Sequence, residues 1–186
     1  MTTRPITGDT WGDEIEGPRT YILGQAAKTL PELRADFDRA HAAFAGQLRA
    51  VSESQAGFKP GRSGGEEDYS IIEVTRHVIQ VYPIMGGRIT SLARAQEGPS
   101  PAGPGSLGGH QGASLAELAG HLQSAHDALI EQIRGVEGTE DLAPTLAHRL
   151  FGELNCRGWL AMTVLHLEDH ARQVAKVKLH PGYPPA

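Results

Sequence analysis

Residues 70–92, SIIEVTRHVIQVYPIMGGRITSL, contain the clearest helical pattern of the chain. Their apolar residues recur at intervals of three and four, as on one face of an α-helix. These residues are Ile71, Val74, Val78, Val81, Met85, Ile89 and Leu92. Ser70 and Glu73 have the spacing of a capping box, in which each side chain bonds the other's backbone N–H. We therefore predict an amphipathic helix over about 70–96, with Pro83 removing one of its backbone hydrogen bonds.

Three further segments share this apolar spacing: 30–52, 114–135 and 152–178. The first two begin with capping boxes, formed by Thr29 with Glu32 and by Ser114 with Glu117, whereas the third has no clear N-cap. Glycine- and proline-rich stretches separate the segments, and no strand-like alternation of useful length is present. The predicted fold is all-α, a four-helix bundle.

The chain of 186 residues has a length that favours one domain. We expect residues 1–28 to form an irregular N-terminal arm, residues 29–180 the helical bundle, and residues 181–186 a short C-terminal tail. Because the arm contains Trp11, it could pack on the bundle or on a second copy.

The composition excludes several classes of protein. A formal net charge of −5 argues against nucleic-acid and polybasic membrane partners, which require a basic surface. No stretch approaches the roughly 20 apolar residues of a membrane span, and the N-terminus lacks the apolar run of a secretory signal. A single cysteine forms no intramolecular disulfide, which suits a reducing compartment. We expect a cytoplasmic protein without nucleic-acid or membrane partners.

Two histidines near the C-terminus raise the question of a metal site. His166 and His170, in LHLEDHARQ (165–173), are four residues apart and lie on one face of a helix. Such a pair is more often a pair of surface histidines. His77 lies among apolar residues of another helix, where a lone histidine is usually a satisfied core residue. Together the three match a catalytic zinc site with an open fourth position, and we predict that they bind a metal.

Other metal-site patterns do not fit. A zincin requires a glutamate directly after the first histidine, and Leu167 follows His166. An inverted zincin requires glutamate where this chain has Asp169. A di-iron bundle requires Glu-x-x-His motifs, but Glu73 precedes His77 by four residues.

Three further residues have two interpretations each, and a fourth, His41, has one. Gln173, one turn after His170, could orient a ligand or bond a neighbouring helix. Cys156 is expected to be a buried, inert thiol rather than a nucleophile or ligand. His126 could add a polar group near the metal or lie on the surface, and His41 is expected to be partly buried.

Two motifs, DYSIIEVTRHVIQ (68–80) and HLEDHARQ (166–173), resemble those of the DinB/YfiT-like superfamily, which consists of four-helix-bundle metalloenzymes. The resemblance covers roughly 30–178. Its matching residues are Tyr69, Ser70 and His77 in the first motif and His166, His170 and Gln173 in the second. Tyr69 stands where the family usually has tryptophan.

The resemblance implies a divalent metal held by the three histidines, most often zinc or nickel, with iron and manganese as alternatives. It implies a thiol S-transferase or a hydrolase acting on a small molecule, such as a low-molecular-weight thiol, and a homodimer. One metal site could activate either water or a thiol. The alternative is a non-catalytic, metal-binding or stress-associated bundle. No sequence feature identifies a substrate, so both classes stay open.

Overall fold

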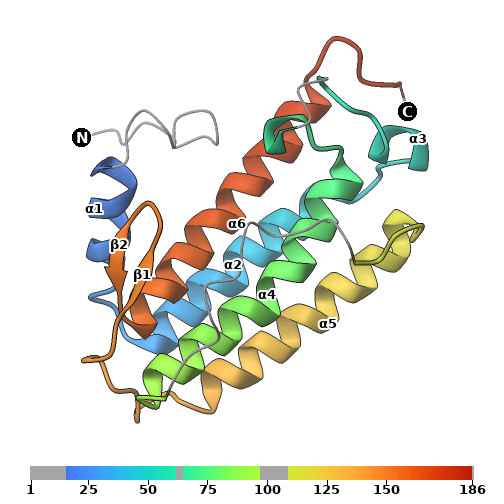
Figure 1. The fold of residues 1–186 in the computed structure, drawn as a ribbon. Coiled ribbons are helices and arrows are strands. Elements are labelled where there is room, and N and C mark those ends of the chain that lie inside the picture. Colours follow the sequence, from blue (N-terminus) through green and yellow to red (C-terminus); the bar gives the residue numbers. More distant parts are fainter. Residues whose placement is uncertain (1–15, 62–64, 97–108, 186) are drawn as a thin grey trace.

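The computed structural model describes residues 16–61, 65–96 and 109–185, which are mostly helical (Figure 1). The longest elements are α2 (Leu30–Gln47), α4 (Ile71–Ala93), α5 (Leu115–Arg134) and α6 (Cys156–Lys178). The short elements are α1 (Glu16–Gln25), α3 (Glu53–Ala56), the 3₁₀ helix η2 (Glu66–Asp68), β1 (Leu146–His148) and β2 (Gly152–Leu154). Each segment predicted to be helical contains one of the long helices, so the predicted helical class is confirmed. None of the described helices is long and apolar enough to cross a membrane.

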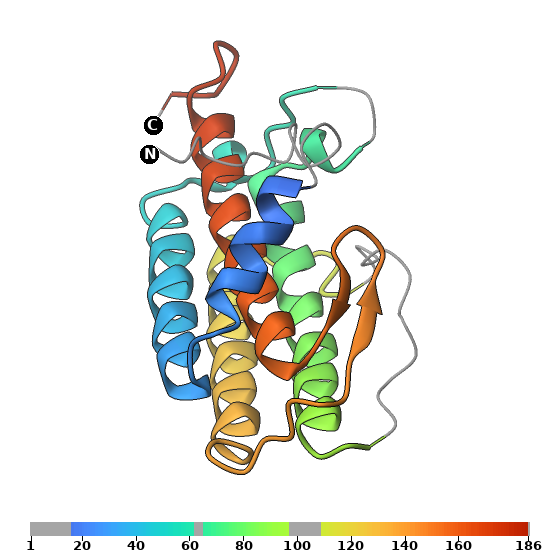
Figure 2. The same ribbon diagram turned by 90° about the vertical axis from the view of Figure 1, so that its left-hand side faces the viewer.

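The four long helices lie side by side around a shared apolar core. Helix α6 packs against both α2 and α4, while α5 packs on the other side of α4 and also touches α2 (Figures 1 and 2). The largest fully buried side chains come from all four helices, and they include Phe37, Tyr82, Leu118 and Trp159. This packing fixes the separation between α4 and α6, the two helices that carry the predicted metal ligands.

The predicted helix starts are present as capping boxes. The Ser70 hydroxyl accepts from the backbone N–H of Glu73 at 3.3 Å, and the Glu73 carboxylate accepts from the backbone N–H of Ser70 at 2.9 Å. The same reciprocal pair is formed by Thr29 with Glu32 and by Ser114 with Glu117. Helix α6 has an N-cap that the sequence analysis did not identify, because the Asn155 side chain accepts from the backbone N–H of Gly158 at 2.9 Å.

The prediction of an irregular arm is wrong for residues 16–25, which form helix α1 and lie against α6 (Figure 2). Only Pro18 and Ile22 of this helix are buried, so its apolar pattern is too sparse to show a helical period. Residues 1–15 of the expected arm, with Trp11, lie outside the described residues, as does most of the linker 97–113.

The start of the last predicted helix is also wrong, because residues 152–154 form a strand. Strand β2 pairs with β1 in antiparallel register, with Leu146 opposite Leu154 and His148 opposite Gly152. Gly152 has a φ of 74°, a left-handed conformation that glycine adopts without strain and that interrupts a helix. Strands of three residues are too short to show the alternation by which a strand is recognised in a sequence.

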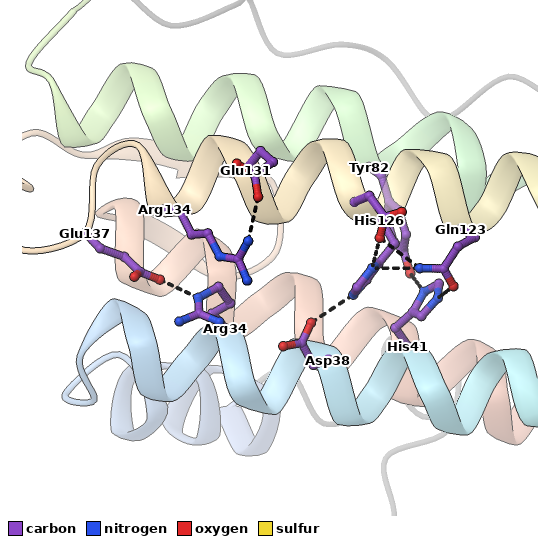
Figure 3. A network of polar contacts seen from close by, with 10 residues as sticks. Arg34, Asp38, His41, Tyr82, Gln123, His126, Glu131, Arg134 and Glu137 are labelled. Atoms are coloured by element: carbon purple, nitrogen blue, oxygen red, sulfur yellow. Dashed lines mark hydrogen bonds and ion pairs between the residues drawn. The ribbon is translucent and has the colours of Figure 1, made fainter.

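A polar network ties α2 to α5 (Figure 3). The rings of His41 and His126 stack with centroids 3.9 Å apart. His126 Nε2 lies 2.9 Å from Asp38 Oδ1, and its Nδ1 lies 3.2 Å from Asp127 Oδ1. His126 is therefore occupied on both ring nitrogens by carboxylates, and it belongs to this network rather than to the predicted metal site.

His41 makes the stability of the fold depend on pH. Its Nδ1 lies 3.2 Å from the Tyr82 hydroxyl and its Nε2 lies 3.3 Å from Gln123 Oε1, so the neutral ring satisfies both contacts. Burial, and then the neighbouring His126, lower the pKa of His41 from 6.5 to about 4. Since the folded pKa is the lower one, the stabilisation is present above about pH 6.5 and is lost as pH falls towards 4.

We expect the free energy of unfolding to fall less steeply below pH 6.5 in His41→Gln than in the parent protein. The expected difference is about 1 kcal/mol per pH unit at most. Denaturant titrations at several pH values measure it, and His121→Gln on the exposed side of α5 is the control. Identical slopes in the parent protein and His41→Gln would contradict this role of His41.

Candidate metal centre

The three predicted ligands come together between α4 and α6. His77 is on the first half of α4, and His166 and His170 are one turn apart near the middle of α6. The Nε2 atom of His166 lies 3.2 Å from that of His77 and 3.1 Å from that of His170. All three rings therefore direct the same nitrogen at one point, which two unrelated surface histidines and a core histidine would not do.

A fourth residue, Glu66, joins this cluster and was not among the predicted ligands. Its Oε1 lies 3.4 Å from Nε2 of His170 and 3.7 Å from Nε2 of His77. The four ligand atoms all lie within 4.8 Å of one another. Glu66 begins the 3₁₀ helix η2, directly before α4, and its side chain is 53% exposed. The cluster thus has three nitrogens supplied by long helices and one oxygen on its solvent side.

Burial keeps the three imidazoles uncharged. Burial and the neighbouring histidines lower the pKa of His170 to about 3 and that of His166 well below its ordinary value. Burial also lowers the pKa of His77, against an opposing contribution from Glu66. Neutral imidazole is the form that binds metals, so the cluster is ready to do so at neutral pH.

Gln173 determines which nitrogen of His170 is free. The side-chain amide of Gln173 donates to the backbone carbonyl of Glu66 at 2.6 Å, which leaves its Oε1 as an acceptor. That oxygen lies 2.7 Å from Nδ1 of His170, so Nδ1 carries the proton and Nε2 presents its lone pair to the cluster. Of the two interpretations of Gln173, the geometry matches the one in which it orients a ligand, and it also bonds η2.

The spacing of the donor atoms fits a divalent cation. Atoms bound to one tetrahedral ion at about 2.0–2.1 Å lie about 3.4 Å from each other. Separations of 3.1, 3.2 and 3.4 Å are close to this value, and the His77–Glu66 separation of 3.7 Å is slightly longer. Imidazole and carboxylate donors suit several first-row metals, so the donor set does not select one of them.

Cys156 takes no part in the cluster. It is fully buried at the start of α6, and burial raises the pKa of its thiol. Its sulfur lies 3.7 Å from the backbone carbonyl of Asp141. The prediction of a buried thiol is confirmed.

Comparison with known proteins gives one match. The family model of the DinB superfamily matches residues 36–174, a range that includes all four residues of the cluster and Gln173. No curated protein and no solved structure matches the chain. Since the matched range spans most of the sequence, the chain belongs to the DinB superfamily.

Proposed function

We propose that this protein is a cytoplasmic, divalent-metal-dependent enzyme that acts on a small molecule. In this proposal the long helices form a DinB-type four-helix bundle, and His77, His166 and His170 hold a zinc or nickel ion. The observation that carries the proposal is the convergence of three uncharged imidazole nitrogens on one point. The reaction class is thiol S-transfer or hydrolysis, and a homodimer is the expected assembly.

A divalent ion with an open position supplies Lewis acidity, which makes water or a thiol a nucleophile near neutral pH. The chain supplies the rest. Gln173 holds the His170 ring in one tautomer, and the burial of His77 and His170 shields their rings from water. Glu66 Oε1, on the open side, is placed to accept the proton that the incoming nucleophile loses.

Glu66 also gives the alternative function a structural basis. If its carboxylate were a permanent fourth ligand, the site would be closed and the bundle would bind metal without catalysis. The difference in length between the helices that carry the histidines and the one that carries Glu66 favours catalysis. The histidines are on helices of 23 residues, whereas Glu66 is half-exposed on a 3₁₀ helix of 3 residues. A carboxylate on so short an element can move aside for a substrate.

The cobalt-substituted protein tests the proposal. We expect N-acetylcysteine to produce a thiolate-to-cobalt absorption band, and Glu66→Gln to bind the thiol at least as tightly. This result would show that the ion has a position open to a thiol. A spectrum that no thiol changes in either protein would contradict the transferase. A band that appears only in Glu66→Gln would instead support the closed, non-catalytic site.

Gln173→Ala is expected to weaken metal binding about 10- to 100-fold, because it removes the acceptor that fixes the His170 tautomer. Gln173→Glu keeps an acceptor for Nδ1 of His170 and should reduce the metal affinity less than Gln173→Ala does. Chelator competition gives the affinities, and Lys176→Ala, on an exposed position of the same helix, is the control. Equal affinities in Gln173→Ala and the parent protein would show that the hydrogen bond does not orient the ring.

A further inference from the structure

Arg88 of α4 is a buried cation that has no anionic partner among the described residues. Only 6% of the residue is exposed, and its guanidinium carbon lies 4.7 Å from the ring centroid of Trp159 on α6. Its Nε has no hydrogen-bond partner, and within the described part of the chain no carboxylate forms an ion pair with it. The guanidinium group therefore makes a cation–π contact with the Trp159 ring.

The contacts of the described residues offset only part of the cost of this arrangement. A cation–π contact returns only a small part of the free energy lost when a charge leaves water, and buried charges are normally paired. An arginine that served packing alone would be better replaced by an apolar side chain of similar length. A bound anion would instead pair with the guanidinium and offset the cost of its burial.

The hairpin histidine His148 lies beside the Arg88–Trp159 pair, with its ring centroid 5.4 Å from that of Trp159. His148 of β1 accepts at Nδ1 from the backbone N–H groups of Leu150 and Phe151, so its proton is on Nε2. Burial, followed by the charges of Arg88 and Arg149, lowers the pKa of His148 to about 4. The hairpin thus adds a neutral N–H donor beside the Arg88–Trp159 pair, and the charge of Arg149 also acts on that histidine.

Arg88 and Trp159 lie on the same faces of α4 and α6 as the histidines of the metal centre. Arg88 follows His77 by eleven residues and Trp159 precedes His166 by seven, so each pair lies within about 20° around its helix. The distance between the two levels is about 10 Å along α6, and about 16 Å along α4.

We propose that Arg88 binds the carboxylate of a small-molecule ligand whose other end reaches the histidine cluster. The planar guanidinium matches a carboxylate with two parallel hydrogen bonds, whereas a phosphate dianion would call for more cationic donors than this position has. The assignment of that ligand as the substrate rests on the proposed function, but the anion site itself does not. The substrate class is a carboxylic acid whose reacting group lies about 10–16 Å from its carboxylate, the range that the two helices give.

Trp159 fluorescence provides the test. The chain has two tryptophans, so Trp11→Phe leaves Trp159 as the only emitter and serves as the parent. We expect acetate and benzoate to change its emission saturably, and acetamide and benzamide to leave it unchanged. Arg88→Met should weaken carboxylate binding at least 10-fold, and Arg88→Lys should weaken it less, because the positive charge is kept. Arg88→Met should also melt at the same or a higher temperature than the parent, because an unpaired buried charge has gone.

Three results would overturn the proposal: equal responses to acids and amides, carboxylate binding retained in Arg88→Met, or tighter binding of inorganic phosphate than of carboxylates. A lower melting temperature for Arg88→Met would mark Arg88 as structural. Metal content is measured on the same samples. If the protein contains metal but binds no carboxylate, this inference fails and the proposed function stands. If it binds carboxylates but contains no metal, the anion site stands and its assignment to a substrate fails.

Discussion

His166→Ala is expected to reduce bound metal from near one ion per chain to a small fraction of that value. The Nε2 atom of His166 is the one that lies within 3.2 Å of the corresponding atoms of both other histidines. Its loss leaves two imidazoles and a half-exposed carboxylate, which hold a divalent ion far more weakly. Plasma mass spectrometry of untagged protein measures the content, and circular dichroism checks that the helices are kept.

His121→Ala is the matched control for this prediction. The rings of His110 and His121 lie 4.2 Å apart between centroids, so they are another pair of imidazoles where a metal could bind adventitiously. We expect His121→Ala to keep the full metal content. A loss of metal in His121→Ala, or its retention in His166→Ala, would place the ion outside the α4–α6 cluster.

Ile22→Ala is expected to destabilise the protein by about 2–5 kcal/mol, because it opens a cavity in the core. Ile22 belongs to α1, outside the four predicted helices, yet it is completely buried within the shared apolar core. Leu23→Ala in the same helix is the control, since Leu23 is 47% exposed and should change stability by no more than about 0.5 kcal/mol.

Denaturant unfolding of both variants gives the two free energies. A large loss for Ile22→Ala alone would establish that α1 is an integral part of the fold. Equal and small losses for both variants would show that α1 does not pack on α6.

The residues that the sequence predicts best are those whose role is local. Ser70 and Glu73 bond each other across one helical turn, and their spacing is sufficient to predict the contact. His166 and His170 share a face for the same reason, and an inward-facing His77 supplies the third nitrogen. These features depend on the 3.6-residue period and little else.

The residues that were missed depend on where distant segments meet. Glu66 lies in a loop with three consecutive acids, and nothing in the sequence distinguishes it from Glu67 and Asp68 until η2 is placed beside His170. Arg88 lies among the apolar positions of α4. It stands out only in the folded structure, where it is buried and no acid of the described residues pairs with it. Tertiary placement, rather than local period, makes both residues candidates for function.

Anomalous X-ray diffraction from crystals of the metal-loaded protein tests the central claim most directly. We expect one strong peak between α4 and α6, bonded to the Nε2 atoms of His77, His166 and His170, and the absorption edge identifies the metal. Crystals grown with zinc or nickel that show no peak there, or a peak only at His110 and His121, would contradict it.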